Sequence, residues 1–290
     1  MQLRPRYDGP AIIDLDHVAE NPSTAVLRQR SRLAAVLVGL SDEEWAAPSR
    51  CRGWSVQDVI EHLVGVNRYW AHSVTEGLKG TPTRLLTDFD PVSVPASMVD
   101  AARGRPPSAT LDAFTSTNDR LTELWSSLDE AEWSTVAEAP PGHLALRAVA
   151  VHALWDSWIH ERDVLLPLSR VQPVEADEVE LTLAYAAAIG PAFRVTATAE
   201  ARSGTLAVIA HHPEITLHVD QGEVVRVRRG LLASSAPTVE GDAVRLAEGF
   251  SRRGPQPAIT DEDRWLIAGL EEAFDDGSAQ PASATARDPR

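Results

Sequence analysis

Three side chains that can act as metal ligands recur at four-residue steps in one apolar stretch of the sequence. They are His152, Asp156 and His160, with Ala, Leu, Trp, Ser and Ile between them. Steps of four place side chains on one face of a helix. An aspartate among apolar residues is costly to bury unless it is paired, hydrogen-bonded or bound to a cation. The pattern therefore indicates a ligand site, a solvated polar face, or an aspartate and histidine that satisfy each other in the core.

A cation site in a helical bundle needs a ligand from a second helix, because one helix presents only two or three donors to one point. His62, at the edge of an apolar stripe in another predicted helix, is the candidate. With Asp156 and His160 it offers a donor set that suits zinc and also accepts nickel, iron or manganese, with one position left open as in catalytic sites. His152 is an alternative ligand, although such a histidine more often supports a ligand or packs. Asp163 is expected either to orient His160 or to form a solvated ion pair.

Helical periodicity predicts the elements that position these residues. A connection rich in proline and glycine spans residues 81–107. Four long helices are expected around it, over residues 25–40, 56–76, 108–128 and 149–167. Four long helices with one long crossover predict a four-helix bundle.

The pattern changes after Pro173. Residues 175–189 still show helical spacing, whereas four later runs alternate with a period of two and predict an antiparallel meander. These runs are 193–198, 205–210, 215–220 and 224–228, and helices are expected over 241–253 and 260–274. The predicted fold is a bundle domain, residues 20–170, followed by a small α+β domain with an antiparallel sheet, residues 171–274. Residues 275–290 are small and polar and are expected to form a disordered tail.

Composition argues against several classes of partner. The chain has 290 residues and a net charge of −15, which works against binding to a nucleic-acid backbone. No apolar stretch approaches the ~20 residues of a membrane span. The N-terminus lacks a signal-like apolar segment, so we expect a cytoplasmic protein without membrane partners. Cys51 is the only cysteine, which excludes an internal disulfide and agrees with a reducing compartment, and no base for it is evident.

Three segments carry the candidate ligands and their surroundings. They are Leu40-Ser-Asp-Glu-Glu-Trp45, Cys51-Arg-Gly-Trp54-Ser-Val-Gln-Asp-Val-Ile-Glu-His62-Leu, and Asp156-Ser-Trp-Ile-His160-Glu-Arg-Asp163. In order and spacing they resemble the DinB-like bundle of the mycothiol-dependent maleylpyruvate isomerase family. The resemblance implies that His62, Asp156 and His160 are metal ligands. The family commonly has glutamate in place of Asp156, so we expect the shorter side chain to alter metal affinity or metal identity.

The second half of the chain is similar to the sterol-carrier-protein-like domain of the same family. The similarity lies in the segment from Gly241 to Pro255 and implies that Arg252 is a functional arginine that reaches the substrate. Ser251 replaces a glycine of the family pattern, and the adjacent Arg253 is the alternative by one position. An arginine suits a carboxylate-bearing substrate because its planar fork binds such groups through two hydrogen bonds. The alternative is a solvated helix end, where cations are favoured.

The resemblance implies an enzyme that uses a divalent metal, zinc first, and mycothiol as thiol cosubstrate. A metal-bound thiolate would attack a small electrophile, and the outcome would be S-transfer or cis–trans isomerisation. Two alternatives stay open. The chain is a noncatalytic module that binds a metal or small molecule, or a hydrolase in which metal-bound water is the nucleophile. The expected partners are the electrophile and mycothiol, with the protein as monomer or homodimer.

Overall fold

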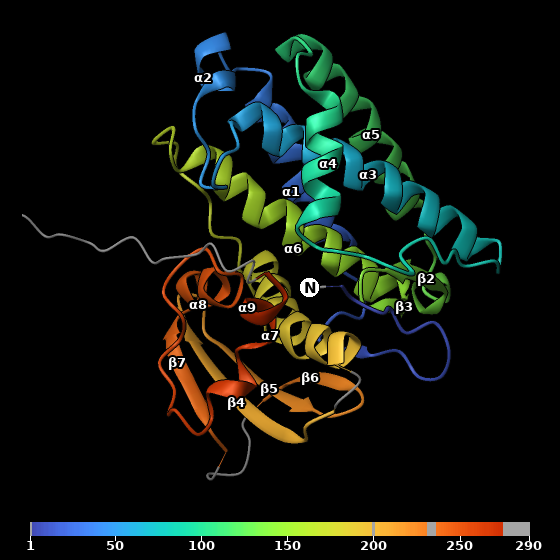
Figure 1. Ribbon diagram of the computed structural model, residues 1–290, viewed down its shortest axis with the longest axis vertical. Coiled ribbons are helices and arrows are strands. Elements are labelled where there is room, and N and C mark those ends of the chain that lie inside the picture. The colour runs from blue at the N-terminus through green and yellow to red at the C-terminus, as the bar shows by residue number, and fades with distance from the viewer. Residues whose placement is uncertain (1, 199–200, 231–235, 275–290) are drawn as a thin grey trace, which may run out of the picture.

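The computed structural model describes residues 2–198, 201–230 and 236–274 of the chain. Figure 1 shows a helical part joined to a smaller part in which helices pack on a sheet. The predicted order, a helical domain followed by an α+β domain, is confirmed. The tail expected over residues 275–290 lies outside the described residues. None of the described helices combines the length and apolarity needed to cross a membrane.

The four long helices predicted for the bundle are confirmed. They are α1 (Ser23–Leu37), α3 (Val56–Leu78), α5 (Pro107–Ser127) and α6 (Leu146–Leu165). Ser55 and Asp58 form a capping box that begins α3. A second capping box begins the short helix α2 (Asp42–Ala46), which precedes α3. Helix α6 is buried around most of its circumference because it contacts both the bundle and the second domain.

One helix, one hairpin and one 3-10 turn of the described helical part were not predicted. Helix α4 (Ser93–Ala102) lies within residues 81–107, so the expectation of a helix-free connection is wrong there. Its Pro95 occupies the first turn, where a missing N–H costs no intrahelical hydrogen bond, and Val99 is buried. A two-stranded antiparallel hairpin and a 3-10 turn also precede α6. They are η1 (Glu132–Ser134), β2 (Val136–Ala139) and β3 (Gly142–Ala145).

The second domain contains a five-stranded sheet with the order β1-β6-β5-β4-β7. Its strands are β1 (Ile13–His17), β4 (Gly204–His211), β5 (Ile215–Gln221), β6 (Val225–Arg229) and β7 (Thr238–Asp242). The predicted antiparallel meander is present in β4, β5 and β6. The sheet as a whole is mixed, because β1 pairs parallel to β6 and β7 pairs parallel to β4. Strand β1 precedes the bundle in the chain, and the boundaries at residues 20 and 171 stay a prediction.

Helix α7 (Ala176–Thr198) overturns the strand expected over residues 193–198. Its buried residues Ile189, Ala192, Phe193 and Thr196 follow helical spacing, and this packing outweighs the β-branched composition. The remaining helices of the domain are shorter than the predicted ranges. They are α8 (Ala243–Phe250), a 3-10 turn η2 (Arg264–Leu266) and α9 (Gly269–Phe274).

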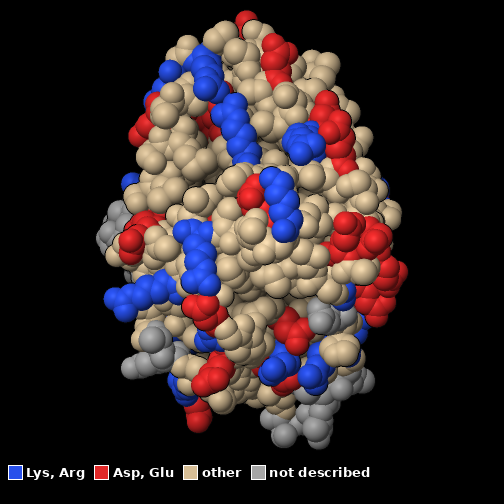
Figure 2. Space-filling model, turned by 90° about the vertical axis from the view of Figure 1, so that its right-hand side faces the viewer, with Lys and Arg blue, Asp and Glu red and all other residues tan. Residues whose placement is uncertain are grey.

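Helix α7 joins the two parts of the molecule. It packs against α6 on one side and against β1, β5 and β6 on the other (Figure 1). One buried apolar cluster runs from the bundle through α6 and α7 to the sheet. On the face shown in Figure 2, acidic and basic side chains are interspersed, and acidic residues gather along its right-hand edge. Because α6 is packed from both sides, residues of both parts can contribute to one site.

Candidate metal centre

Helices α3 and α6 bring the three predicted ligands together. The Nε2 atoms of His62 and His160 each lie 3.5 Å from Oδ1 of Asp156. The two imidazole rings have centroids 4.8 Å apart. His62 and His160 are buried, whereas the Asp156 side chain is 16% exposed. The four-residue spacing on α6 and one residue from the facing helix thus produce a single cluster.

The spacing of these donor atoms fits a divalent cation. Zinc binds imidazole nitrogen and carboxylate oxygen at about 2.0–2.2 Å, so two ligands of a tetrahedral site lie roughly 3.3–3.5 Å apart. The distances from Asp156 Oδ1 to His62 Nε2 and to His160 Nε2 are both 3.5 Å, which falls in this range. The Nδ1 atom of His62 is buried without a hydrogen-bond partner among the described residues. Although aspartate is one methylene shorter than glutamate, Asp156 reaches both imidazoles.

Asp163 fixes the orientation of the His160 ring. Its side chain is fully buried, and its Oδ2 accepts a hydrogen bond from Nδ1 of His160 at 3.0 Å. A proton on Nδ1 leaves the lone pair of Nε2 directed at Asp156 and His62, as a metal ligand requires. Of the two roles expected for Asp163, the structure shows the orienting contact, and it also shows an ion pair with Arg253 that is buried rather than solvated.

Charge coupling affects the protonation of this cluster. Burial raises the pKa of Asp156, but the imidazoles of His62 and His160 outweigh burial and hold that pKa below its ordinary value. Burial lowers the pKa of His160, but its acidic neighbours, with Cys51 first, outweigh burial and raise the pKa to about 10. An imidazolium cannot ligate a metal, so cation binding must release this proton.

A second group of possible ligands lies on the opposite side of the His160 ring. Cys51 Sγ lies 3.7 Å from His160 Nδ1 and donates to Asp163 Oδ2 at 3.2 Å. Arg253 donates from Nε to Asp163 at 2.9 Å and from Nη2 to Cys51 Sγ at 3.5 Å. A cation here would compete with the guanidinium for the same carboxylate. Charge therefore favours the group described first as the metal site.

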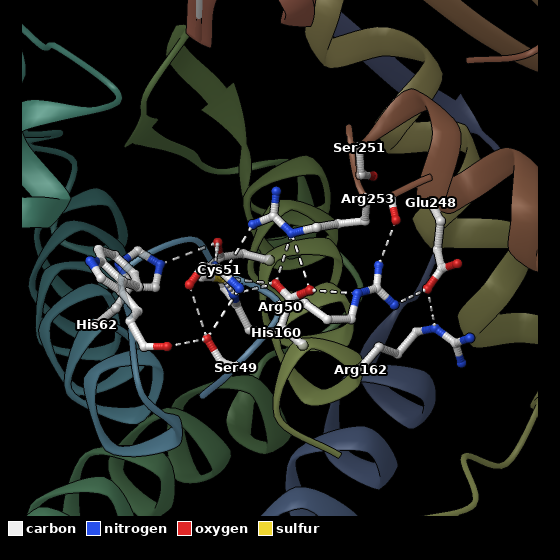
Figure 3. Close-up of polar contacts among 12 residues, drawn as sticks. Ser49, Arg50, Cys51, His62, His160, Arg162, Glu248, Ser251 and Arg253 are labelled. Atoms are coloured by element: carbon white, nitrogen blue, oxygen red, sulfur yellow. Dashed lines mark hydrogen bonds and ion pairs between the residues drawn. The ribbon is translucent and has the colours of Figure 1, made fainter. Parts of the chain in front are cut away.

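A set of ion pairs connects this region to the second domain (Figure 3). Arg50, in the loop before α3, donates from Nη1 to Glu248 of α8 at 2.6 Å and from Nη2 to the carbonyl oxygen of Arg253 at 2.8 Å. Arg162, near the end of α6, donates to the same Glu248 oxygen at 2.9 Å. The loop that carries Cys51 is therefore anchored to the segment that carries Arg253.

Two other candidates lie outside the ligand cluster. Nδ1 of His152 lies 2.6 Å from the hydroxyl oxygen of Tyr185, and burial lowers the pKa of His152 to about 4, so that it is neutral at pH 7. Arg252 adopts a φ of 58° and donates to the carbonyl oxygen of Glu271 at 3.3 Å. The arginine that contacts Asp163 is the adjacent residue, Arg253.

The sequence did not predict that Cys51 lies beside His160 and Asp163. Cys51 belongs to the same sequence motif as His62, and this shared motif was the available signal of its position. However, 109 positions separate it from His160, and 202 from Arg253. Only the packing of the loop against α6 and the end of α8 brings these groups together.

Fold and site together define a class: a four-helix bundle with a candidate metal centre, packed against an α+β domain that adds an arginine. Residues 26–165 match the family model described as the mycothiol maleylpyruvate isomerase N-terminal domain. Residues 26–165 are therefore identified as a domain of this family, and the resemblance found in that part of the sequence is confirmed.

Two solved structures are similar to the chain over most of its length. One is described as the crystal structure of the mycothiol-dependent maleylpyruvate isomerase, with a TM-score of 0.57, 14% identity, and coverage of 82% of this chain and 91% of that chain. The other is a histidine-to-alanine mutant of that isomerase, with a TM-score of 0.57, 13% identity and the same coverage. At such identities the likeness shows the fold. No curated protein matches the chain significantly.

Proposed function

We propose that the chain is a divalent-metal-dependent enzyme that uses mycothiol to act on a small electrophile, as an S-transferase or a cis–trans isomerase. The observation that carries the proposal is the convergence of His62, Asp156 and His160 at 3.5 Å spacing. The match of residues 26–165 to the family model supports the use of mycothiol, because the similar crystal structure is described as mycothiol-dependent.

His62, Asp156 and His160 would hold the metal, and their two nitrogens and one oxygen favour zinc. A divalent cation at this position would supply Lewis acidity that favours the thiolate form of a thiol at neutral pH. Asp163 keeps the proton of His160 on Nδ1, so that Nε2 presents its lone pair to the site. The 16% exposure of the Asp156 side chain leaves solvent access to this side of the cluster.

Arg253 is the proposed substrate-facing arginine, in place of Arg252. Its side chain is 27% exposed, and its Nε is held by the fully buried Asp163. Asp163 thus contacts both a proposed ligand, His160, and the cationic group from the second domain. A guanidinium held in this way is oriented to bind a carboxylate or to stabilise negative charge that develops on an electrophile.

The proposal is tested with His62→Ala and the matched control His72→Ala, which changes an exposed histidine of the same helix. We expect His62→Ala to lose bound metal and thiol-dependent turnover, and His72→Ala to keep both. Metal is measured in the purified proteins, and products are identified by mass spectrometry with and without mycothiol on a panel of electrophiles. Full metal content and activity in His62→Ala would contradict the proposal.

The same experiment separates the alternatives. Products formed at equal rates without thiol select a hydrolase that uses water. Binding of mycothiol and electrophile without turnover selects a noncatalytic module. An S-linked product selects the transferase, and a rearranged substrate with the thiol regenerated selects the isomerase.

A further inference from the structure

A surface groove of about 590 Å³ lies where the helical part meets the second domain. The end of α6 and the connection to α7 form one side, and the β4–β5 turn and the start of α8 form the other. We call it the junction groove. Its residues from the first side are Arg162, Leu166, Arg170, Val171, Gln172 and Val174. Small-molecule sites commonly have volumes of roughly 300–1,000 Å³, and the groove falls in this range.

The junction groove opens on a different side of α6 from the metal ligands. Arg162 follows His160 by two residues on this helix, and residues two apart do not share a face. Arg162 and Arg50 both donate to Oε1 of Glu248 (Figure 3), at 2.9 Å and 2.6 Å. These ion pairs lie between the groove and the buried Asp163 of the metal centre, which Arg50 also contacts.

One wall of the junction groove is apolar. Leu166, Val171 and Val174 are exposed, and Val171 is 94% exposed. These three are among the seven exposed large apolar side chains in the described parts of the chain. Exposed apolar side chains that gather in a concave surface are typical of a ligand or partner site. The wall therefore indicates a ligand with an apolar body.

Two guanidinium groups line the same groove. Arg162 is 11% exposed, because Glu248 accepts from its Nε and its guanidinium carbon lies 4.9 Å from the ring centroid of Trp158. Neither Nη atom of Arg162 donates a hydrogen bond to another residue of the described ranges. Arg170 lies at the surface and pairs with Glu44. The Nη groups of Arg162 are therefore available to an anion in the groove.

The remaining polar groups also favour an anion. Nε2 of Gln172 is buried without a hydrogen-bond partner among the described residues, which adds an unmatched donor. Besides the imidazole of His212, the only other ionisable group of the lining is Asp242. Its carboxylate caps α8 by accepting from the backbone N–H of Arg245 at 3.0 Å, so the helix N-terminus offsets its charge. Two guanidinium groups against one capped carboxylate make the groove electropositive in a chain of net charge −15.

We propose that the junction groove binds a small amphipathic organic anion at a site separate from the metal centre. The apolar wall covers the body of this ligand, and Arg162 and Arg170 bind its acid group through charge-assisted hydrogen bonds. Such a ligand matches both features of the groove, because a purely apolar molecule leaves the guanidinium groups unmatched and an inorganic anion leaves the wall exposed. The proposal does not depend on the proposed function.

The test uses isothermal titration calorimetry on the full-length protein with its metal content measured. Naphthylacetate is the amphipathic anion, naphthylacetamide has the same body without the charge, and acetate has the charge without the body. We expect naphthylacetate to bind at least about tenfold more tightly than either, because it alone contacts the apolar wall and the guanidinium groups. Equal affinity for naphthylacetate and naphthylacetamide overturns the proposal.

Two variants assign the binding to the junction groove. Arg162→Gln should weaken naphthylacetate binding about tenfold and leave naphthylacetamide unaffected, since a charge-assisted contact is lost. Val171→Ser should weaken both ligands roughly two- to fivefold, because part of the apolar contact is lost. Unchanged naphthylacetate affinity in a folded Arg162→Gln protein overturns the proposal. If this variant does not fold, Arg170→Gln replaces it under the same criterion, because that side chain lies at the surface.

A second groove, of about 670 Å³, supplies matched controls. It lies at the end of α1 and along α5, and it too contains an exposed valine and an arginine, Val38 and Arg120. Its lining also contains three acids, Asp112, Asp119 and Glu123. Because these acids repel an anion, Val38→Ser and Arg120→Gln should leave naphthylacetate affinity unchanged. Losses in these controls equal to those in the junction-groove variants overturn the proposal.

Three measurements exclude other occupants. Arg253→Gln should leave naphthylacetate affinity unchanged, and a loss in this variant but not in Arg162→Gln would place the anion at the metal centre and overturn the proposal. Saturating mycothiol should not compete with naphthylacetate, and competition overturns the separateness of the site. Sedimentation velocity should show the same oligomeric state for wild type and Val171→Ser. A dimer that dissociates in Val171→Ser would make the groove an interface between copies and overturn the proposal.

Discussion

The two sides of the His160 imidazole carry similar residues in different electrostatic surroundings. On the Nε2 side, His62 and Asp156 converge, and no arginine or lysine of the described chain is hydrogen-bonded to Asp156. On the Nδ1 side, Cys51 Sγ and Asp163 Oδ2 lie 3.7 and 3.0 Å from the ring nitrogen, but Arg253 already neutralises the carboxylate. Both sides satisfy a distance criterion for metal binding. The difference teaches that donor geometry alone does not identify a metal site, and that the charges already paired with the donors must be considered.

The largest expected effect is a difference in zinc binding between two variants, each of which lacks one donor on one side of the His160 ring. His62→Ala should weaken zinc binding by at least about a hundredfold, since loss of a direct ligand exceeds the 10- to 100-fold cost of a supporting residue. Cys51→Ser should leave zinc stoichiometry and affinity unchanged. Competition titration with a chelator measures both. Equal losses in the two variants would show that the metal lies on the Nδ1 side or bridges the ring.

Asp163→Asn should weaken zinc binding about 10- to 100-fold, because the carboxylate orients His160 without contacting the metal. The variant should also lose roughly 3 kcal/mol of stability, because it leaves Arg253 without its buried partner. Chelator titration and urea unfolding provide the measurements. The control is Asp119→Asn, an exposed aspartate of α5. An Asp163→Asn protein with wild-type zinc affinity would contradict the orienting role.

Zinc affinity should rise with pH. The pKa of His160 is raised to about 10, so the metal-free site holds a proton below that pH and must release it on binding. Affinity should therefore increase about tenfold per pH unit from about pH 6 to about pH 9, and level off as the pH passes the pKa. Calorimetry in buffers of different ionisation enthalpy counts the released protons. A binding constant independent of pH would contradict this assignment.

Arg50→Gln should have the smallest effect. Arg50 pairs with Glu248 at 2.6 Å and more weakly with Asp163 at 3.4 Å, and Asp163 keeps its closer partner Arg253, so the loss should cost about 1 kcal/mol. Because Arg50 also anchors the loop that carries Cys51, we expect faster alkylation of that cysteine in the variant. Thermal unfolding and the rate of iodoacetamide labelling test this, with Arg68→Gln, an exposed arginine of α3, as control. Unchanged labelling would show that the loop is held by other contacts.

Local signals predicted the bundle helices and the central strands because amphipathic spacing reports burial directly. They failed where packing overrides local preference. Residues 193–198 are β-branched and aromatic yet helical, since α7 continues between α6 and the sheet. The parallel edge strand β1 was missed because a short N-terminal segment carries no sign of its partner, which lies about two hundred residues away in the chain. Helix α4 was missed because its proline sits where prolines are tolerated.

The sequence by itself determined the three candidate ligands, because helical periodicity fixes which side chains of α6 share a face and the motif around His62 supplies a partner helix. It also indicated the family whose N-terminal domain residues 26–165 match. Tertiary structure alone decided that Asp163 orients His160, that Arg253 is the arginine at the centre, and that Cys51 lies beside both. These relations depend on how two domains pack, and packing joins residues that no local pattern relates.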